Sequence, residues 1–410
     1  MTSLTDNRWA MLICGTLVLL VLGLIYAWSI FVAPLEVEFG WERSQTTSIF
    51  SVSMVMWSCG MLACGPISSK LPLRVCYAIG SGMLVVGFAL APVATEIWHL
   101  YLFYGILCGF GTGFCYNLWT SSVFAFFPDR TGLASGILLM GFGMGSLVLG
   151  SAATAVIYSP IGWRGTFYVL ALLVVILAFL SAPFLKRPSV NGTDAKTEKR
   201  SESLLLEDAQ GLTGIQMLKT GSFWLYTLWK VLVMGASAAI IAQAVPLMTS
   251  LGASIMFATA VAGALSVGNG LGRPIIGTIY DKAGRDFTLI ALAVSAVIVG
   301  VFLVAGYMAS NLLITAVGMF LQGIIYGGYA TVNTTFVRTV YGQKHVATNL
   351  GISSFTLMPF NAIFPVLAGF AFAWFGDYTT ALMALPVLAA ISLASAVLVI
   401  RILDKGRRHR

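Results

Sequence analysis

The stretch GRPIIGTIYDKAGR, residues 272–285, decides the fold that the sequence predicts, because it joins two apolar runs through a short charged loop. A loop of similar pattern, GPISSKLPLR, occupies residues 65–74, and its Gly65 corresponds to Gly277 of the later loop. Two more stretches repeat at nearly the same offset: IGWRGTFYVLAL (161–172) and FGDYTTALMAL (375–385). Repetition at a common offset indicates that the chain consists of two related halves.

The composition places the chain in a membrane. Of its 410 residues, 58% are hydrophobic and 9% are charged, and the mean hydropathy is +0.91. Soluble domains carry about 25% charged residues. The sequence therefore predicts an integral membrane protein.

Apolar segments long enough to cross a bilayer recur throughout the chain. A hydrocarbon core of about 30 Å needs about 20 apolar residues for each helical crossing. We expect an all-α membrane protein with twelve transmembrane helices in two six-helix halves. The predicted spans are 9–34, 45–69, 72–93, 97–127, 132–158, 163–185, 222–249, 255–280, 287–308, 310–337, 346–374 and 378–402.

A polar segment from Lys186 to about Leu212 separates the first six spans from the last six. We expect an N-terminal half at 1–187, a cytoplasmic linker at 188–220 and a C-terminal half at 221–410. The first span has no convincing cleavage site after a short apolar core, so we expect a retained helix rather than a removable signal peptide.

The basic residues predict the orientation. With the N-terminus inside, nineteen Lys and Arg residues fall on the inner side, and Arg43 and Arg164 fall on the outer side. Both termini are therefore expected in the cytoplasm, with the protein in the cell inner membrane. The net charge of +8 reflects this bias and attraction to anionic lipid, not a nucleic-acid footprint.

The cysteines show no metal-binding or redox pattern. No C-x-x-C pair or Cys/His cluster occurs, so we expect no metal, no cofactor and packed thiols. The six residues are Cys14, Cys59, Cys64, Cys76, Cys108 and Cys115.

The later loop matches a known motif. Its pattern G-x-x-x-D-[RK]-x-G-R, which begins at Gly277, resembles the hallmark loop of the major facilitator superfamily, whose halves alternate access to a central site. The resemblance implies gating roles for Asp281, Lys282 and Arg285. The first-half copy is degenerate, with Ser69 in place of the acid and Pro72 in place of the glycine.

Four further stretches resemble the oxalate/formate antiporter family and the related monocarboxylate transporters. Their order and spacing are specific to this subfamily but not to a substrate. They are YAWSIFVAPL (26–35) with FGWERSQTTSIFS (39–51), FFPDRTGLASG (126–136), FWLYTLW (223–229) and GRPIIGTIYDKAGR (272–285).

Arg273 is the candidate substrate anchor. It lies eight residues before Asp281 and therefore about 12 Å deep, at a cost of at least about 2.5–3.5 kcal/mol. No Asp or Glu lies inside a predicted span, so a mobile anion is the natural counter-charge, and a guanidinium binds a carboxylate through two parallel hydrogen bonds. The alternative is an arginine satisfied by backbone carbonyls or aromatic rings. Nearby glycines allow close helix packing, room for a ligand, or both: Gly268, Gly270 and Gly272.

The family resemblance sharpens this prediction, because the arginine of the eighth helix binds the carboxylate there. Asn269 occupies the place of an aspartate found in some proton-coupled monocarboxylate transporters. Leu357 occupies the place of a second cation, a lysine, in oxalate-type transporters. A single cavity cation, Arg273, suits a monoanion better than a dianion.

Lys230 lies about seven residues into the seventh predicted span. One interpretation is that it extends to the cytoplasmic headgroups or pairs structurally, and the other is that it serves the cavity.

Aromatic and amide groups on helices one, four, seven and ten are expected to complete the site. Tyrosine hydroxyls donate to carboxylates, and ring faces exclude water. The resemblance favours Tyr26, Tyr116 and Tyr326, whereas packing between helices is the alternative for the others. The remaining candidates are Trp28, Asn117, Trp119, Tyr329 and Asn333.

Three other classes are less compatible with the sequence. A membrane enzyme would need paired acids or an activated nucleophile within the spans, and a channel would need filter loops or rings of charge. A drug/proton antiporter usually carries Gly-Pro in its fifth helix, whereas residues 136–150 contain no proline.

We therefore predict a monomeric secondary transporter that is not an enzyme and that moves small carboxylates. Lactate or pyruvate is the first choice and oxalate/formate exchange the second. The coupled partner is a proton or a counter-anion.

Overall fold

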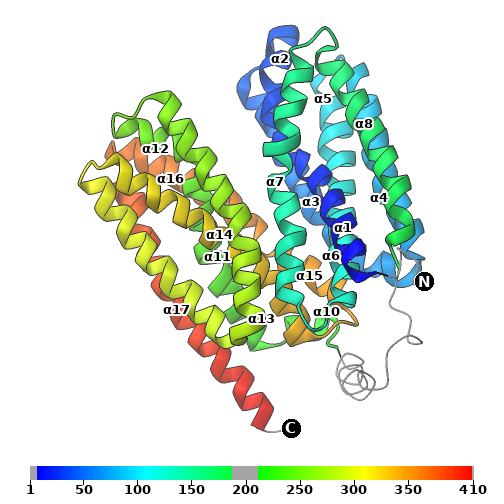
Figure 1. Ribbon diagram of the computed structural model, residues 1–410. Helices are drawn as coiled ribbons and strands as arrows, with labels where there is room; N and C mark the ends of the chain where they lie inside the picture. The colour runs from blue at the N-terminus through cyan, green and yellow to red at the C-terminus, as the bar shows by residue number, and fades with distance from the viewer. Residues whose placement is uncertain (1–6, 187–210, 409–410) are drawn as a thin grey trace. The chain divides into compact units, whose positions relative to one another are not determined.

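The computed structural model describes residues 7–186 and 211–408, and in this part of the chain the regular elements are helices (Figure 1). Most of the predicted linker, residues 187–210, therefore lies outside the described residues. The chain forms two compact units whose boundaries differ from the sequence halves. Unit 1 comprises the described residues of Met1–Pro128, Ile137–Thr213 and Arg338–Phe355, and unit 2 those of Asp129–Gly136, Gly214–Val337 and Thr356–Arg410.

Unit 1 is built mainly from the first half of the sequence. Several of its spans change helix type along their length, with 3₁₀ segments η2, η3 and η5 and the π-helical segment η4. Its elements are α1 (Arg8–Leu22), η2 (Gly23–Trp28), α2 (Ser29–Phe39), α3 (Arg43–Lys70), α4 (Leu73–Leu90), η3 (Ala91–Val93), α5 (Ile97–Leu100), η4 (Tyr101–Cys108), α6 (Gly109–Phe126), most of α7 (Thr131–Ile157), α8 (Gly162–Ser181), η5 (Ala182–Phe184) and α15 (Val346–Phe355).

Unit 2 is built mainly from the second half of the sequence. Within it, α17 packs on α11 and α13, and α16 packs on α11. Its elements are α10 (Gly214–Leu218), α11 (Gly221–Ala242), α12 (Ala244–Ser250), α13 (Ile255–Met308), most of α14 (Leu312–Tyr341), α16 (Met358–Phe375) and α17 (Thr379–Arg408).

The twelve predicted spans are confirmed once α13 is counted as two. Eleven described helical segments are long and apolar enough to cross a membrane, and one of them, α13, has 54 residues. Such a helix would be about 80 Å long if it were straight. Gly284 instead has φ 85° and ψ 171°, a backbone conformation that glycine adopts without steric penalty. A Cβ on Gly328 would lie 2.7 Å from Ile276 and 3.0 Å from Leu292, so residues on both sides of Gly284 meet the same point of α14.

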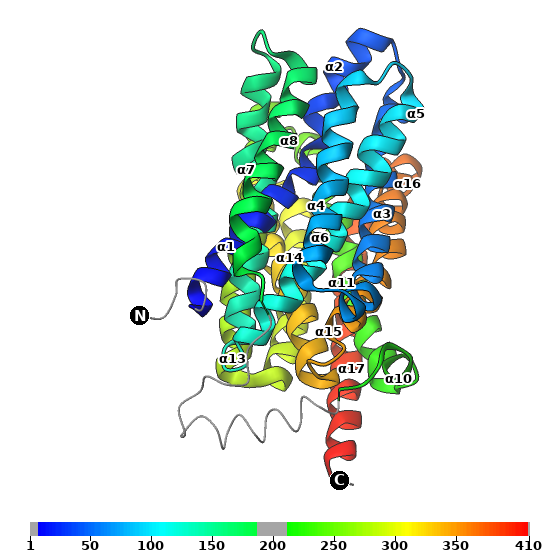
Figure 2. The ribbon, with the colours of Figure 1, turned by 90° about the vertical axis from the view of Figure 1, so that its right-hand side faces the viewer.

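The eleventh span is interrupted at Thr356 and Leu357, between α15 and α16. Pro359 explains the break, because it lacks an N–H and its ring clashes with the preceding helical turn. The two pieces belong to different units: α15 packs on α3 and α6 in unit 1 (Figure 2), whereas α16 packs on α11 in unit 2.

Each unit includes one short segment from the other half of the sequence. Residues 129–136, which contain the start of α7, belong to unit 2, and residues 338–355, which contain the end of α14 and all of α15, belong to unit 1. We call the α7 start (131–136) and the α15 start (346–351) the two docked segments. The predicted boundaries at 187/188 and 220/221 remain a prediction of the sequence.

Candidate functional site

Arg273 is buried within unit 2, with 6% of its surface exposed. It lies on the first limb of α13, and its Nε donates to Oδ1 of Asn269, one helical turn earlier, at 3.3 Å. Arg273 also has at least one further interaction. The neutral Asn269 amide therefore orients the guanidinium while leaving its charge in place.

Glycines bring α13 and α14 into backbone contact beside this pair. A Cβ on Gly272 would lie 2.2 Å from the Ile324 carbonyl oxygen, and one on Gly327 would lie 2.1 Å from the Asn269 carbonyl oxygen. Neither position has space for a side chain, so the GxxxG-like spacing on both helices sets their close approach. The contacts of Gly268 and Gly272 with α14 therefore favour helix packing as the role of these glycines.

The close approach places Tyr326 of α14 within electrostatic range of Arg273. Tyr326 is half-buried, and its hydroxyl can donate to a carboxylate held by the guanidinium. Of the predicted site residues, Arg273, Asn269 and Tyr326 thus come together in unit 2. Tyr329, one turn further on, is fully buried, stacks on Trp229 at 4.1 Å and hydrogen-bonds Ser392, which is a packing role.

Lys230 does not reach the surface. Its side chain is fully buried on α11, and its Nζ donates to Oδ1 of Asn333 at 3.1 Å and to Oγ1 of Thr356 at 3.4 Å. Extension to the headgroups is therefore wrong for Lys230, and the pairing interpretation describes its contacts. The position of Lys230 in the seventh predicted span did not show whether its side chain faces lipid or the neighbouring helices.

Asp281 holds the α7 docked segment. Its carboxylate oxygens accept from the backbone N–H groups of Gly132 and Leu133, both at 2.7 Å. These N–H groups belong to the first turn of α7, where no carbonyl of the same helix is available, and an acid there also complements the helix dipole. Asp281 therefore caps α7 from α13.

The same segment packs tightly on α13 between Asp281 and the arginine. A Cβ on Gly277 would lie 2.0 Å from the Gly132 carbonyl oxygen, and one on Gly136 would lie 2.6 Å from the Arg273 carbonyl oxygen. The α7 start thus contacts the backbone of the candidate anchor. Lys282 is exposed, and Arg285 pairs with Asp286 at 2.6 Å, so their predicted gating roles remain predictions.

In unit 1, three aromatic side chains meet Phe142. Tyr116 is buried and meets Phe142 edge-on at 4.8 Å, while Tyr26 is 42% exposed and meets it edge-on at 5.3 Å. Trp57 lies 5.5 Å from Tyr116 and 6.3 Å from Phe142. The structure therefore brings Tyr26 and Tyr116 together. Sequence reasoning missed Trp57 and Phe142, since neither the second nor the fifth span had been expected to contribute.

Trp28, Trp119 and Asn117 have packing contacts in unit 1. All three are buried; Trp28 Nε1 donates to the Thr46 carbonyl at 2.8 Å. Asn117 Nδ2 donates to the carbonyls of Met61 and Ala347, both at 2.7 Å. These contacts favour the packing alternative, and we leave the three residues out of the proposed site.

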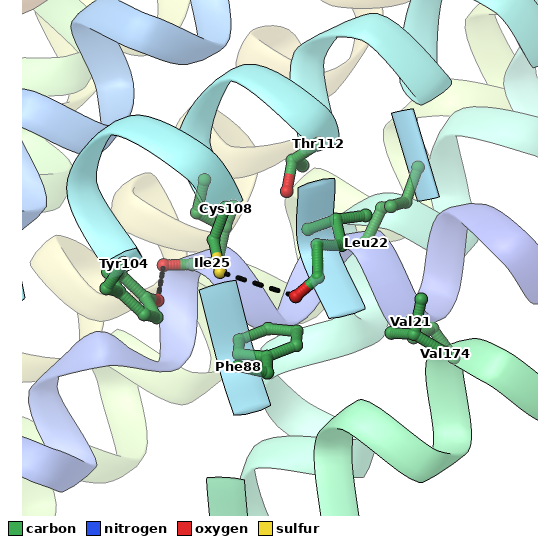
Figure 3. A pocket seen from close by; sticks show the side chains of 9 residues that line it. Val21, Leu22, Ile25, Phe88, Tyr104, Cys108, Thr112 and Val174 are labelled. Carbon is green, nitrogen blue, oxygen red and sulfur yellow. Dashed lines mark hydrogen bonds between the residues drawn. The ribbon is translucent and has the colours of Figure 1, made fainter. Parts of the chain in front are cut away.

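Figure 3 shows a small void in unit 1, lined mainly by apolar side chains. Its volume is about 10 Å³, which is room for about one water. At its edge, the Tyr104 hydroxyl of the π-helical segment donates to the Ile25 carbonyl of η2 at 3.1 Å, which satisfies an oxygen where α1 gives way to a 3₁₀ turn. The void is too small for a carboxylate.

The family profile described as Major Facilitator Superfamily matches residues 11–356 and 231–410. The chain belongs to this superfamily. It is therefore a multi-pass membrane protein and a secondary transporter, not an enzyme, as predicted.

Two curated relatives narrow the family. The chain is 25% identical to the oxalate:formate antiporter of Oxalobacter formigenes over 350 residues, which is 84% of this chain and 81% of the relative. It is 30% identical to monocarboxylate transporter 12 of Mus musculus over 179 residues, which is 43% of this chain and only 35% of that relative. The predicted resemblance to these two groups is thus confirmed.

Solved structures confirm the fold class. The proton:xylose symporter gives a TM-score of 0.75 at 15% identity, covering 97% of this chain and 96% of that one. The fucose:proton symporter of E. coli gives a TM-score of 0.67 at 14% identity, covering 95% and 98%. At these identities the likeness concerns the fold alone.

Proposed function

We propose that this member of the superfamily transports small carboxylates, with Arg273 as the carboxylate anchor. A short monocarboxylate such as lactate or pyruvate is the first candidate. The observation that carries the proposal is the burial of Arg273 beside Asn269 and Tyr326, in a unit whose predicted spans contain no acidic residue. A bound carboxylate would neutralise the guanidinium through two parallel hydrogen bonds.

Oxalate/formate exchange is the second candidate. A relative that matches over most of both chains is an oxalate:formate antiporter, and exchange also suits the charge of Arg273. An empty carrier retains this positive charge, which is costly to move through a low-dielectric barrier, whereas the loaded carrier is neutralised at that site.

The roles of the remaining candidates follow from their positions. Tyr326 would donate to the bound carboxylate, and Asn269 would hold the guanidinium in orientation. The contribution of Tyr26 and Tyr116, which lie in unit 1, stays a prediction of the sequence. Asp281 would regulate the docking of the α7 start, which contacts the Arg273 backbone.

The proposal is tested by uptake of labelled lactate, formate and oxalate into proteoliposomes, with the variant Arg273→Lys. A lysine keeps the charge but loses the planar two-pronged donor, so we expect carboxylate affinity to fall about tenfold or more. Arg401→Lys is the matched control, because Arg401 is exposed on α17. Unchanged affinity in Arg273→Lys would refute the anchor, and saturable transport of cationic drugs without carboxylate transport would refute the substrate class.

A further inference from the structure

Lys230 is the second buried cation of unit 2, and the function proposed for Arg273 gives it no role. Its ammonium bridges α11 to Asn333 of α14 and to Thr356 at the break before α16. The ring of Tyr226, one turn earlier on α11, lies 5.7 Å from Nζ. Burial of an ammonium costs several kcal/mol, so its placement here calls for a reason.

The two oxygen partners suit a neutral amine as well as an ammonium. The Thr356 hydroxyl accepts a hydrogen bond from an ammonium and can donate one to the lone pair of an amine. The Asn333 amide contains both an acceptor and donors. These two hydrogen bonds can therefore be kept when a proton arrives at Lys230 or leaves it.

Arg273 cannot take this role. A guanidinium stays charged in proteins, whereas a lysine side chain can exchange its proton. Between these two buried cations, the structure therefore separates a permanent charge on α13 from an exchangeable charge on α11.

The partners of Lys230 lie where the chain passes between the units. Unit 2 ends at Val337, four residues after Asn333, and resumes at Thr356 itself. The residues between these points, 338–355, belong to unit 1 and include the α15 docked segment. Lys230 thus hydrogen-bonds residues that flank this segment in the sequence.

We propose that Lys230, held by Asn333 and Thr356, is the proton-binding site that couples proton movement to carboxylate transport, a step that rests on the function proposed above. One proton from water binds the Nζ lone pair on one side of the membrane and returns to water on the other. Unlike the exchange scheme above, in which the loaded carrier is neutralised, the carrier with both ligands then has the same positive charge as the empty carrier with a neutral amine, so charge alone favours neither crossing. The net movement is one proton with one monocarboxylate, which carries no charge.

Among the described residues, ionisable groups lie on the helix of Lys230 and on three of the helices that contact it. Tyr226 is the titratable neighbour on its own helix, while α10 and α16, which pack on α11, contain no ionisable residue. On the other helices that contact α11, the ionisable residues are Tyr326, Tyr329, Arg338 and Tyr341 of α14, Arg273, Tyr280, Asp281, Lys282, Arg285, Asp286 and Tyr307 of α13, and Arg401, Asp404, Lys405, Arg407 and Arg408 of α17.

The test measures protons and labelled lactate together in proteoliposomes loaded with a pH-sensitive dye, after subtraction of protein-free vesicles. We expect the unmodified protein to move about one proton with each lactate. Lys230→Arg keeps a charge that does not titrate and Lys230→Met has none, so in both variants the number of protons moved with each lactate should fall to about zero. Lys219→Met, at an exposed lysine before α11, is the control and should match the unmodified protein. Proton movement that persists in either variant, or lactate uptake without protons in the unmodified protein, would overturn the proposal.

A second measurement does not depend on the substrate. The unfolding temperature of the detergent-solubilised protein is compared with that of Lys230→Met between about pH 5 and pH 9. The difference should change with pH, because only the unmodified protein gains or loses a proton at this position. Parallel curves would overturn the proposal even if neither variant transported lactate. If the difference depended on pH but the protein did not transport carboxylates, the proposed substrate class would be wrong and the proton-binding site at Lys230 would still be supported.

Discussion

The two docked segments have similar packing but different chemistry. In unit 2, the α7 start lies against Gly277 of α13, and in unit 1 the α15 start lies against Gly65 of α3, where a Cβ would come within 2.5 Å of the Thr348 backbone. In unit 2 a carboxylate, Asp281, caps the docked helix. The corresponding Ser69 in unit 1 donates to the Pro66 carbonyl of its own helix.

In unit 1, which has Ser69 in place of the acid, neutral side-chain amides form hydrogen bonds between the helices. Asn117 links the Met61 and Ala347 carbonyls, and Gln343 Nε2 donates to the Ser121 carbonyl at 3.3 Å. Glycine packing is thus shared by both docked segments, whereas the charged cap belongs to unit 2, which also contains Arg273 and Lys230. We infer that close packing against glycine holds the docked segment in both units. A charged side chain, Asp281, adds to this hold in unit 2.

The largest effect should come from removing the shared packing. Gly277→Ala and Gly65→Ala each place a Cβ against backbone, where overpacking costs about 1–3 kcal/mol and corresponds to about 5- to 150-fold slower exchange. Exchange rates in proteoliposomes measure this effect. Gly263→Ala on α13 and Gly82→Ala on α4 are matched controls, since their Cβ atoms would meet nothing within 4 Å. If one unit tolerated its substitution, the packing would not be equivalent.

Asp281→Asn should come next. Hydrogen bonds to a charged acceptor are worth about 1 kcal/mol more than neutral ones, so losing two of them should change turnover about 5- to 30-fold. Carboxylate affinity should change less than turnover, because Asp281 contacts the docked segment and not the anchor side chain. Asp286→Asn, in the same turn, is the control. Weakened binding with normal turnover would contradict the capping role.

Asn117→Leu should have a smaller effect in unit 1. The substitution keeps the side-chain size and removes two neutral hydrogen bonds, worth about 0.5 kcal/mol each at the low end of the usual range, so turnover should change by about fivefold. Affinity measured alongside turnover distinguishes packing from binding. A loss of carboxylate affinity at normal turnover would return Asn117 to the substrate site predicted from the sequence.

The smallest effect should come from supplying the missing acid. Ser69→Asp adds a carboxylate near the first turn of α15, where charge–dipole attraction is worth about 0.3–1 kcal/mol. We expect exchange to slow about two- to fivefold because the docked state is held more firmly. Ser69→Ala is the control. Identical rates for the two variants would show that the α15 segment cannot be capped from α3.

Apolar periodicity and the repeated loop were sufficient to predict the fold, since each span needed only its own residues to be recognised. The contacts within the site were harder to predict from the sequence. Asp281 and Gly132 lie far apart in sequence, and nothing in either stretch indicates that a side chain of α13 caps α7. For Lys230, the position in the span predicts how deep the side chain lies in the membrane but not which neighbouring helices it contacts. Arg273, Asn269 and Tyr326 could be selected because a midplane charge and its polar neighbours are rare in apolar runs.

The reversal of α13 at Gly284 has a consequence for biogenesis. Its limbs are joined by a single residue at positive φ, so they are suited to enter the bilayer as a helical hairpin rather than one after the other. The second limb, residues 287–308, carries no charged residue, and its partitioning into lipid can offset the cost of inserting Arg273 with the first. A β-branched residue at 284 disfavours this turn, so we expect Gly284→Val to lower the amount of inserted protein more than Gly263→Val does, a difference that membrane-fraction immunoblotting would reveal.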